Sequence, residues 1–122
     1  MSIQFEVGVM KAFSYRDVEA RESGEGSSKV KVRWLITKEM GAPNFAMRLF
    51  EVAAGGFSPL HSHAWEHEVF VLEGNGVVVT EEGNKRIGKG DVVFVAPNEK
   101  HQFKNNSGKP LKFLCIVPHK KE

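Results

Sequence analysis

Four histidines are the residues of this chain best suited to chemistry. His61, His63 and His67 lie close together, and His101 follows later in the sequence. Neutral imidazole is the commonest protein ligand for divalent transition metals. On an extended strand, residues two positions apart point to the same face, so the first three imidazoles would share one face. The spacing predicts a metal site.

The same cluster is open to a second interpretation, because three histidines in a short stretch also occur in solvated polar loops. The flanking residues favour the metal site. Pro59 and Leu60 precede the histidines, and the apolar run 69–72 follows them, so the histidines lead into a buried strand. Glu66 and Glu68 have the opposite parity and would point away from the imidazoles on such a strand.

Composition predicts an ordinary soluble domain. The chain has 122 residues, 41% of them hydrophobic and 26% charged, which is enough for one domain with a proper core. The net charge of +2 is small and the basic residues are scattered, so we expect no nucleic-acid partner. The N-terminus lacks the features of a signal peptide, and no apolar run is long enough to span a membrane, so we expect no membrane partner. With Cys115 as its single cysteine, the chain is expected to be cytoplasmic.

Short apolar runs separated by turn residues predict an all-β fold. Residues 1–28 are expected to form an N-terminal strand or arm, with a possible strand at 3–9, and a flexible Ser/Gly loop. Residues 29–122 are expected to form the barrel of a single domain. Strands recurring every 8–12 residues indicate a β-sandwich or β-barrel. The expected strands are 30–37, 45–52, 68–72, 77–80, 91–95, 101–105 and 111–117.

The histidines lie in two motifs that resemble those of the cupin family. Gly55, His61, His63, His67 and Gly74 resemble the first cupin motif. The second is similar to the stretch from Gly90 through Pro97 and Asn98 to His101 and Asn105. The resemblance covers roughly residues 45–117. It implies a double-stranded β-helix, or jelly-roll, barrel with the histidines converging inside one open end.

Two departures from the family pattern are informative. His67 stands where the family usually has a glutamate ligand, so the chain resembles the small single-domain cupins with four histidine ligands. Glu68 is an alternative ligand by another family spacing, but strand parity and its distance to Gly74 favour His67. In the second motif Asn98 replaces a glycine, and asparagine tolerates positive φ better than most residues.

The resemblance implies a metal site made of His61, His63, His67 and His101. Four protein ligands leave two positions free on an octahedral ion, as catalytic sites require. One divalent transition metal is expected, with Mn²⁺ or Fe²⁺ favoured by the resemblance and Zn²⁺, Ni²⁺ or Cu²⁺ also compatible with imidazole. The neutral ligand set favours an anionic small-molecule substrate.

The pocket around the metal is only partly predicted by strand parity. If odd-numbered side chains of the last strand point inward, three of them line the pocket, and Phe103 joins them from the strand of His101. Cys115 is equally well explained as a small core residue. Arg48 either grips a substrate carboxylate or lies on a surface or interface, and Trp65 lies on the rim or in an interface. The candidate pocket-lining residues are Arg48, Phe103, Phe113, Cys115 and Val117.

Three functions remain open for such a site. The first is a metal-dependent oxygenase acting on a small oxygenated molecule. The second is a non-redox isomerase, epimerase or lyase, for which no positioned base is evident. The third is a non-catalytic module that binds a small ligand. A homodimer is expected, because small cupins often pair through N-terminal strands and residues 1–12 alternate apolar side chains.

Overall fold

In the computed structural model, which describes residues 6–119, almost every regular element is a β-strand. The strands are β1 (Arg21–Glu22), β2 (Ser28–Ile36), β3 (Phe45–Phe57), β4 (His67–Glu73), β5 (Asn75–Thr80), β6 (Gly83–Gly88), β7 (Val92–Val95), β8 (His101–Lys104) and β9 (Leu111–Pro118). Two short 3₁₀ turns, η1 (Tyr15–Asp17) and η2 (Lys38–Met40), complete the described elements. No helix among residues 6–119 is long and apolar enough to cross a membrane.

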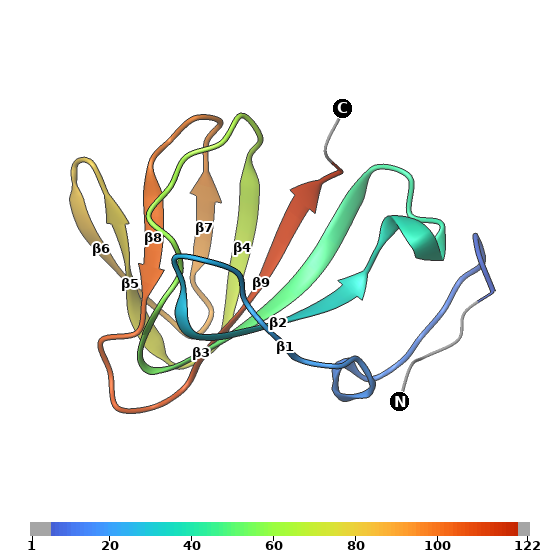
Figure 1. Ribbon diagram of the computed structural model, residues 1–122, viewed down its shortest axis with the longest axis horizontal. Coiled ribbons are helices and arrows are strands. Elements are labelled where there is room, and N and C mark those ends of the chain that lie inside the picture. Colours follow the sequence, from blue (N-terminus) through green and yellow to red (C-terminus); the bar gives the residue numbers. More distant parts are fainter. Residues whose placement is uncertain (1–5, 120–122) are drawn as a thin grey trace.

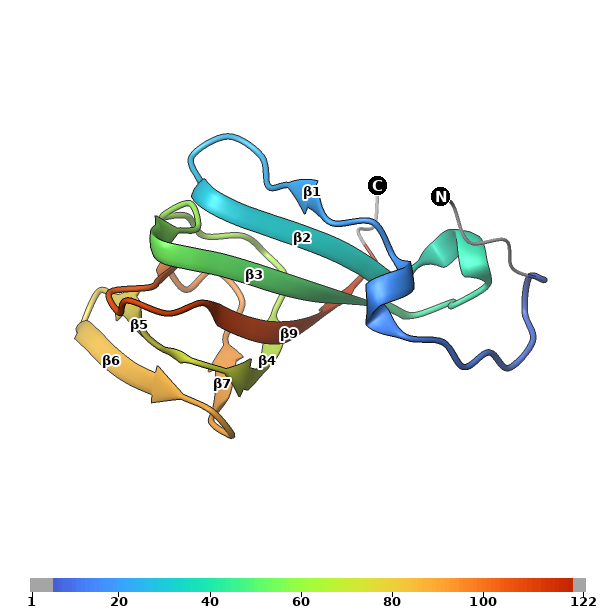
Figure 2. The ribbon, with the colours of Figure 1, turned by 90° about the horizontal axis from the view of Figure 1, so that it is seen from below.

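The strands form one antiparallel sheet that curls over on itself (Figure 1). The hydrogen-bonded order is β6-β5-β8-β3-β9-β4-β7, and β2 pairs with β3 while β1 pairs with β2. The long strand β3 makes this possible: Phe45–Val52 pair with β9, and Phe57 at the other end pairs with β8. Figure 2 shows β2, β3 and β9 running side by side.

The core follows from the period-two alternation of these strands. In β9 every second side chain is buried, beginning at Leu111. Because successive strand residues point to opposite faces, the buried sets of all strands meet inside the curl. Burying each large aliphatic or aromatic side chain stabilises the fold by roughly 1.5–3 kcal/mol. The core cluster is Val30, Val52, Val69, Val71, Val78, Ile87, Val95, Phe103, Leu111, Phe113 and Cys115.

Two turns position the histidine motifs. Gly74 links β4 to β5 with φ of 84°, and a Cβ there would collide with the backbone of Pro110 and Leu111. Glycine is therefore required at this point. Asn98 has φ of 67°, and its N–H donates a hydrogen bond to the carbonyl of His63 at 2.6 Å. The asparagine that departs from the family pattern thus adopts the left-handed conformation and ties the two motifs together.

Three parts of the chain differ from the predicted elements. Strand β6 was not predicted, because only one of its side chains, Ile87, is buried and the alternation is lost. Of the possible strand at 3–9, residues 1–5 lie outside the described part, and residues 7–9 form a turn in which Gly8 has φ of 77°. Residues 62–66 are irregular, and the strand begins only at His67.

The N-terminal segment lies along the outer side of β2. Arg33 anchors it by donating from Nη1 to the carbonyls of Val18 and Tyr15, at 2.6 and 3.4 Å. The same guanidinium donates from Nε to Glu51 at 2.9 Å. The partly buried Arg33 of β2 thus gains partners from residues far away in the sequence.

Candidate metal centre

Backbone pairing joins the two histidine motifs. His61 and His101 form an isolated antiparallel bridge, in which each N–H donates to the other's carbonyl at 3.1 and 2.9 Å. Their imidazole rings lie with centroids 5.0 Å apart. Residues forty positions apart in sequence therefore face each other across the open end of the barrel.

The irregular segment after His61 directs the next imidazole. His63 Nδ1 donates to the carbonyl of Trp65 at 2.7 Å, and the indole stacks on the imidazole with centroids 4.5 Å apart. His101 Nδ1 donates to the carbonyl of Glu99 at 2.8 Å. A carbonyl can only accept, so both rings carry the proton on Nδ1 and keep a free lone pair on Nε2. Metal-binding histidines are commonly oriented in this way.

Three imidazoles have the geometry of a metal site. One ring nitrogen from each of His61, His63 and His101 lies within 4.8 Å of the other two. A group of three imidazole nitrogens this close together could hold one metal ion. His61 is exposed, His63 is partly buried and His101 is buried, so the site lies at the mouth of the barrel rather than in the sealed core.

His67 lies beside this cluster but outside the set of three nitrogens. It is the first residue of β4 and only 8% exposed, and its ring centroid lies 4.4 Å from that of His63 and 5.7 Å from that of His101. The Nε2 atoms of His63 and His67 are buried without a hydrogen-bond partner. Buried polar atoms normally have partners, so two orphaned nitrogens fit the coordination of an ion.

Glu68 faces the other way. It is exposed on the outer side of β4, opposite in parity to His67. Glu66 is exposed as well. Neither carboxylate points into the curl of the sheet.

Burial favours the neutral form of His61, His63 and His67 by lowering the pKa of each. Desolvation lowers the pKa of His61 and of His63 below the ordinary value of 6.5, and it lowers the pKa of His67 to about 3. The positive charge of Arg48 and the neighbouring histidines lower all three pKa values further. Neutral imidazole is the form that binds metals.

Arg48 lies on the inner face of β3. Its Nη2 donates to Cys115 Sγ at 3.1 Å, and its guanidinium lies 4.9 Å from the centre of the Phe50 ring and 5.3 Å from that of Trp34. Arg48 Nε is buried and has no hydrogen-bond partner within residues 6–119. Burial raises the pKa of the Cys115 thiol despite the opposing effect of Arg48. The interior therefore holds a cation beside a neutral thiol.

Aromatic rings connect this cation to the histidines. Phe113 stacks on Phe50 at 5.3 Å and on Phe103 at 4.7 Å between centroids, and Phe103 approaches His101 edge-on at 6.3 Å. Val117 is buried on the same face of β9. Sequence reasoning did not include Phe50 and Trp34 in the site, although Phe50 shares the parity of Arg48 on one strand. Placing Trp34 next to Arg48 requires the register of β2 against β3, in which these two residues are partners.

Comparison with known proteins identifies the family. The family model for the cupin domain matches residues 48–117. The chain belongs to the cupin family. This cupin is similar to the polyketide cyclase RemF from Streptomyces resistomycificus, with 34% identity, a TM-score of 0.85, and coverage of 90% of this chain and 80% of that one. The solved relatives are jelly-roll proteins, so the expected all-β jelly-roll fold is confirmed.

The names of two curated relatives state an activity or a ligand. An oxalate-binding protein from Thermotoga maritima is 31% identical over 96 residues, covering 75% of this cupin and 78% of the relative. A 1-methylthio-D-xylulose 5-phosphate methylsulfurylase from Rhodospirillum rubrum is 34% identical over 71 residues, covering 58% of this cupin. Two of the curated relatives are matched over only about half of their own length, 52% and 46%.

Proposed function

We propose that this cupin is a metal-dependent enzyme in which His61, His63, His67 and His101 bind one divalent transition metal. The observation that carries the proposal is the pair of buried Nε2 atoms without hydrogen-bond partners, one from His63 within the three-histidine cluster and one from His67 next to it. Of these two rings, that of His63 is already oriented by a backbone carbonyl, as is common for metal-binding histidines. The four-histidine set belongs to this proposal.

The ligand set suits Mn²⁺ or Fe²⁺, and imidazole also accepts Zn²⁺, Ni²⁺ and Cu²⁺. When bound, such an ion supplies Lewis acidity and, if redox-active, electron transfer with dioxygen. The protein's own part is to orient the imidazoles through Trp65 and Glu99, and to exclude water with the aromatic rings of Phe103 and Phe113.

An oxygenase is the reaction type that we favour. The buried polar side chains within residues 6–119 are His67, His101 and Asn105, so no buried carboxylate stands ready to abstract a proton. Chemistry carried by the metal needs no such base. The substrate would be a small oxygenated molecule.

An anionic substrate fits the charge of the interior. The positive charge of Arg48 contributes to lowering the pKa of three imidazoles, and its buried Nε has no hydrogen-bond partner among the described residues. A guanidinium binds carboxylates strongly when water is excluded. The likeness to an oxalate-binding protein supports the same ligand chemistry.

A non-redox reaction is the second candidate, favoured by the likeness to the polyketide cyclase RemF. In that case the metal would act only as a Lewis acid. A binding module without turnover is the third, favoured by the oxalate-binding relative. Dioxygen consumption separates the first candidate from the second, and turnover separates both from the third.

The deciding experiment begins with the metal. Full-length protein purified without a nickel column from cells given mixed trace metals should contain close to one equivalent of manganese or iron by elemental analysis. Oxygen uptake is then followed with small oxygenated anions, and product formation is compared with and without air. Zinc alone, or anaerobic turnover, would favour the non-redox candidate. No metal after reconstitution would contradict the central proposal.

We further propose that two copies pair as a homodimer, with residues 1–28 as an arm on the barrel or the partner. Val7, Val9 and Met10 are exposed in the N-terminal segment. An outer apolar face, defined by Phe70, Leu72, Val92 and Phe94, is exposed on β4 and β7. Contiguous exposed apolar surface often marks an interface. The free thiol of Cys115 supports our proposal of a reducing, cytoplasmic setting.

A further inference from the structure

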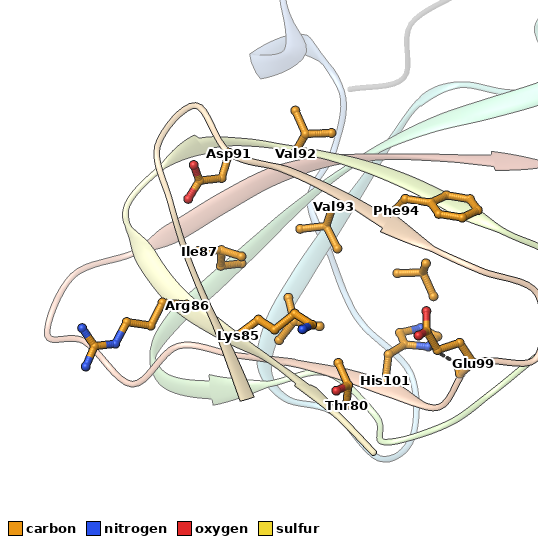
Figure 3. Close-up of a pocket in the computed structure, with 12 residues that line it drawn as sticks. Thr80, Lys85, Arg86, Ile87, Asp91, Val92, Val93, Phe94, Glu99 and His101 are labelled. Carbon is orange, nitrogen blue, oxygen red and sulfur yellow. Dashed lines mark hydrogen bonds between the residues drawn. The ribbon is translucent and has the colours of Figure 1, made fainter. Parts of the chain in front are cut away.

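A cleft opens into the barrel between the two edge strands of the curled sheet. The strand order ends at β6 on one side and at β7 on the other, and among the described residues these two strands do not pair with each other. The gap between them holds a cavity of about 410 Å³, drawn in Figure 3. This volume lies in the range of small-molecule sites, about 300–1,000 Å³.

The interior of the cleft is apolar and leads to the metal centre. Its floor is formed by Val78, Ile87, Val93 and Val95, three of which belong to the core cluster. His101 lines one end, so a molecule lying in the cleft reaches a proposed metal ligand. The cleft therefore adjoins the candidate site at His101.

The charged side chains at the rim differ in whether they have a hydrogen-bond partner within the protein. Asp91 accepts a hydrogen bond from the N–H of Gly88 at 2.7 Å, and Glu99 accepts one from the N–H of Ala96 at 3.2 Å. Both carboxylates thus stabilise turns. The side chain of Lys85 makes no hydrogen bond or ion pair with any other described residue. Figure 3 shows Lys85 extending along the cleft while Arg86 points away from it.

Strand register explains why Lys85 points inward. It pairs with Val78 of β5 and shares the parity of Ile87, whose side chain is buried in the core. The Lys85 side chain is exposed at the cleft, so its charge is accessible to a ligand. Here it lies over an apolar floor, where an anionic group would find a cation without an internal competitor.

We propose that the cleft between β6 and β7 binds the body of an elongated substrate, with Lys85 holding an anionic end and the apolar floor holding the chain. The other end of the molecule reaches the histidines. This inference rests on the proposed function for that last point alone. Lys85 is a specificity residue, and the ligand class is a small molecule with an apolar body and one terminal anionic group.

The test uses octanoate as the probe and metal-free, full-length protein. Amide shifts of Ile87, Val93 and His101 are followed by heteronuclear NMR during titration. Octanoate should shift these amides saturably, while acetate, which lacks the apolar body, and octylammonium, which reverses the charge, should bind more weakly. The Lys85→Gln variant should weaken octanoate binding about three- to fivefold, in the range of an exposed ion pair.

Two further variants serve as controls. Lys89→Gln removes an exposed lysine from the β6–β7 turn that does not line the cleft, and it should leave octanoate binding unchanged. Lys85→Arg keeps the charge and should bind octanoate like the unaltered protein. Equal affinity in Lys85→Gln and the unaltered protein would overturn the proposal. So would shifts confined to the outer apolar face, or a loss seen only in Arg48→Gln.

Metal uptake is measured separately, so that the two proposals can fail independently. Manganese binding by the unaltered protein and by Lys85→Gln should be equal, because Lys85 is not a ligand. Failure of the unaltered protein to bind any divalent metal would contradict the proposed function. The octanoate titration would still test whether the cleft binds an anionic molecule with an apolar body.

Discussion

Trp65 holds the imidazole of His63 in two ways at once. Its carbonyl accepts the Nδ1 proton at 2.7 Å, and its indole lies almost parallel to the imidazole, with an interplanar angle of 6°. The hydrogen bond fixes the tautomer and the stacking fixes the plane of the ring. As a result, Nε2 is the ring nitrogen of His63 that is left without a hydrogen-bond partner, in the cluster that His63 forms with His61 and His101.

Replacing His67 tests the four-histidine site. His67→Gln should weaken manganese binding by more than the roughly 10- to 100-fold that loss of an outer partner costs, because a ligand is removed. Binding is measured by equilibrium dialysis with elemental analysis. Glu68→Gln is the matched control, since Glu68 is adjacent but faces outward, and it should bind as the unaltered protein does. The opposite result would mean that Glu68, not His67, is the fourth ligand.

Stability of the metal-free protein should depend on pH through His67. Its pKa is about 3 in the folded protein against an ordinary value of 6.5, so the unfolded chain binds the proton more readily. The contribution of His67 to the free energy of unfolding should be fully present above about pH 6.5. It should be lost as the pH falls from there toward 3. Urea unfolding in the presence of a chelator measures this. His67→Gln should flatten the dependence; an unchanged slope would assign it to other groups.

Arg48 should control the affinity for small anions. Arg48→Gln is expected to weaken oxalate binding to the metal-loaded protein about tenfold, because one charge-assisted pair in a dry site is lost. Isothermal titration calorimetry provides the measurement. Arg21→Gln removes an exposed arginine on β1, away from the histidines and the cleft, and should have no effect. If both variants bind oxalate equally well, Arg48 serves the packing of Phe50 and Trp34 instead.

Removing residues 1–12 tests the dimer. The deletion should convert the protein to a monomer or make it insoluble, because exposed apolar surface would lose its cover. Light scattering gives the mass directly. If the shortened protein is still a dimer, the arm does not form the interface. Phe94→Glu, on the outer apolar face, would then show whether β7 holds the two copies together.

Asn105 should be critical for stability rather than for binding. It is 1% exposed, and its Nδ2 donates to the carbonyls of Val52 and Lys109 at 2.9 and 2.7 Å. Asn105→Ala leaves both carbonyls without this donor and should cost about 2–4 kcal/mol of unfolding free energy. Denaturant unfolding measures the loss. Asn106→Ala, exposed next to it, should change stability by less than about 0.5 kcal/mol.

The sequence by itself determined the all-β class, most strand positions and the histidine motifs. Period-two alternation is a local property, so β4 and β9 were predictable from residues such as Val69 and Phe113. The choice between His67 and Glu68 as the inward residue also followed from parity. In contrast, β6 has only Ile87 buried, so its identity as a strand depends on pairing with β5.

Only the tertiary structure decided how the site is assembled. His61 meets His101 through a backbone bridge, and His63 is directed by an irregular segment that no periodicity describes. The inward direction of Arg48 required the register of β3 against β9, where it pairs with Cys115. Pairing between distant strands is a long-range property, because it depends on where other segments lie rather than on neighbouring residues. The cleft at Lys85 exists for the same reason, since two edge strands leave it between them.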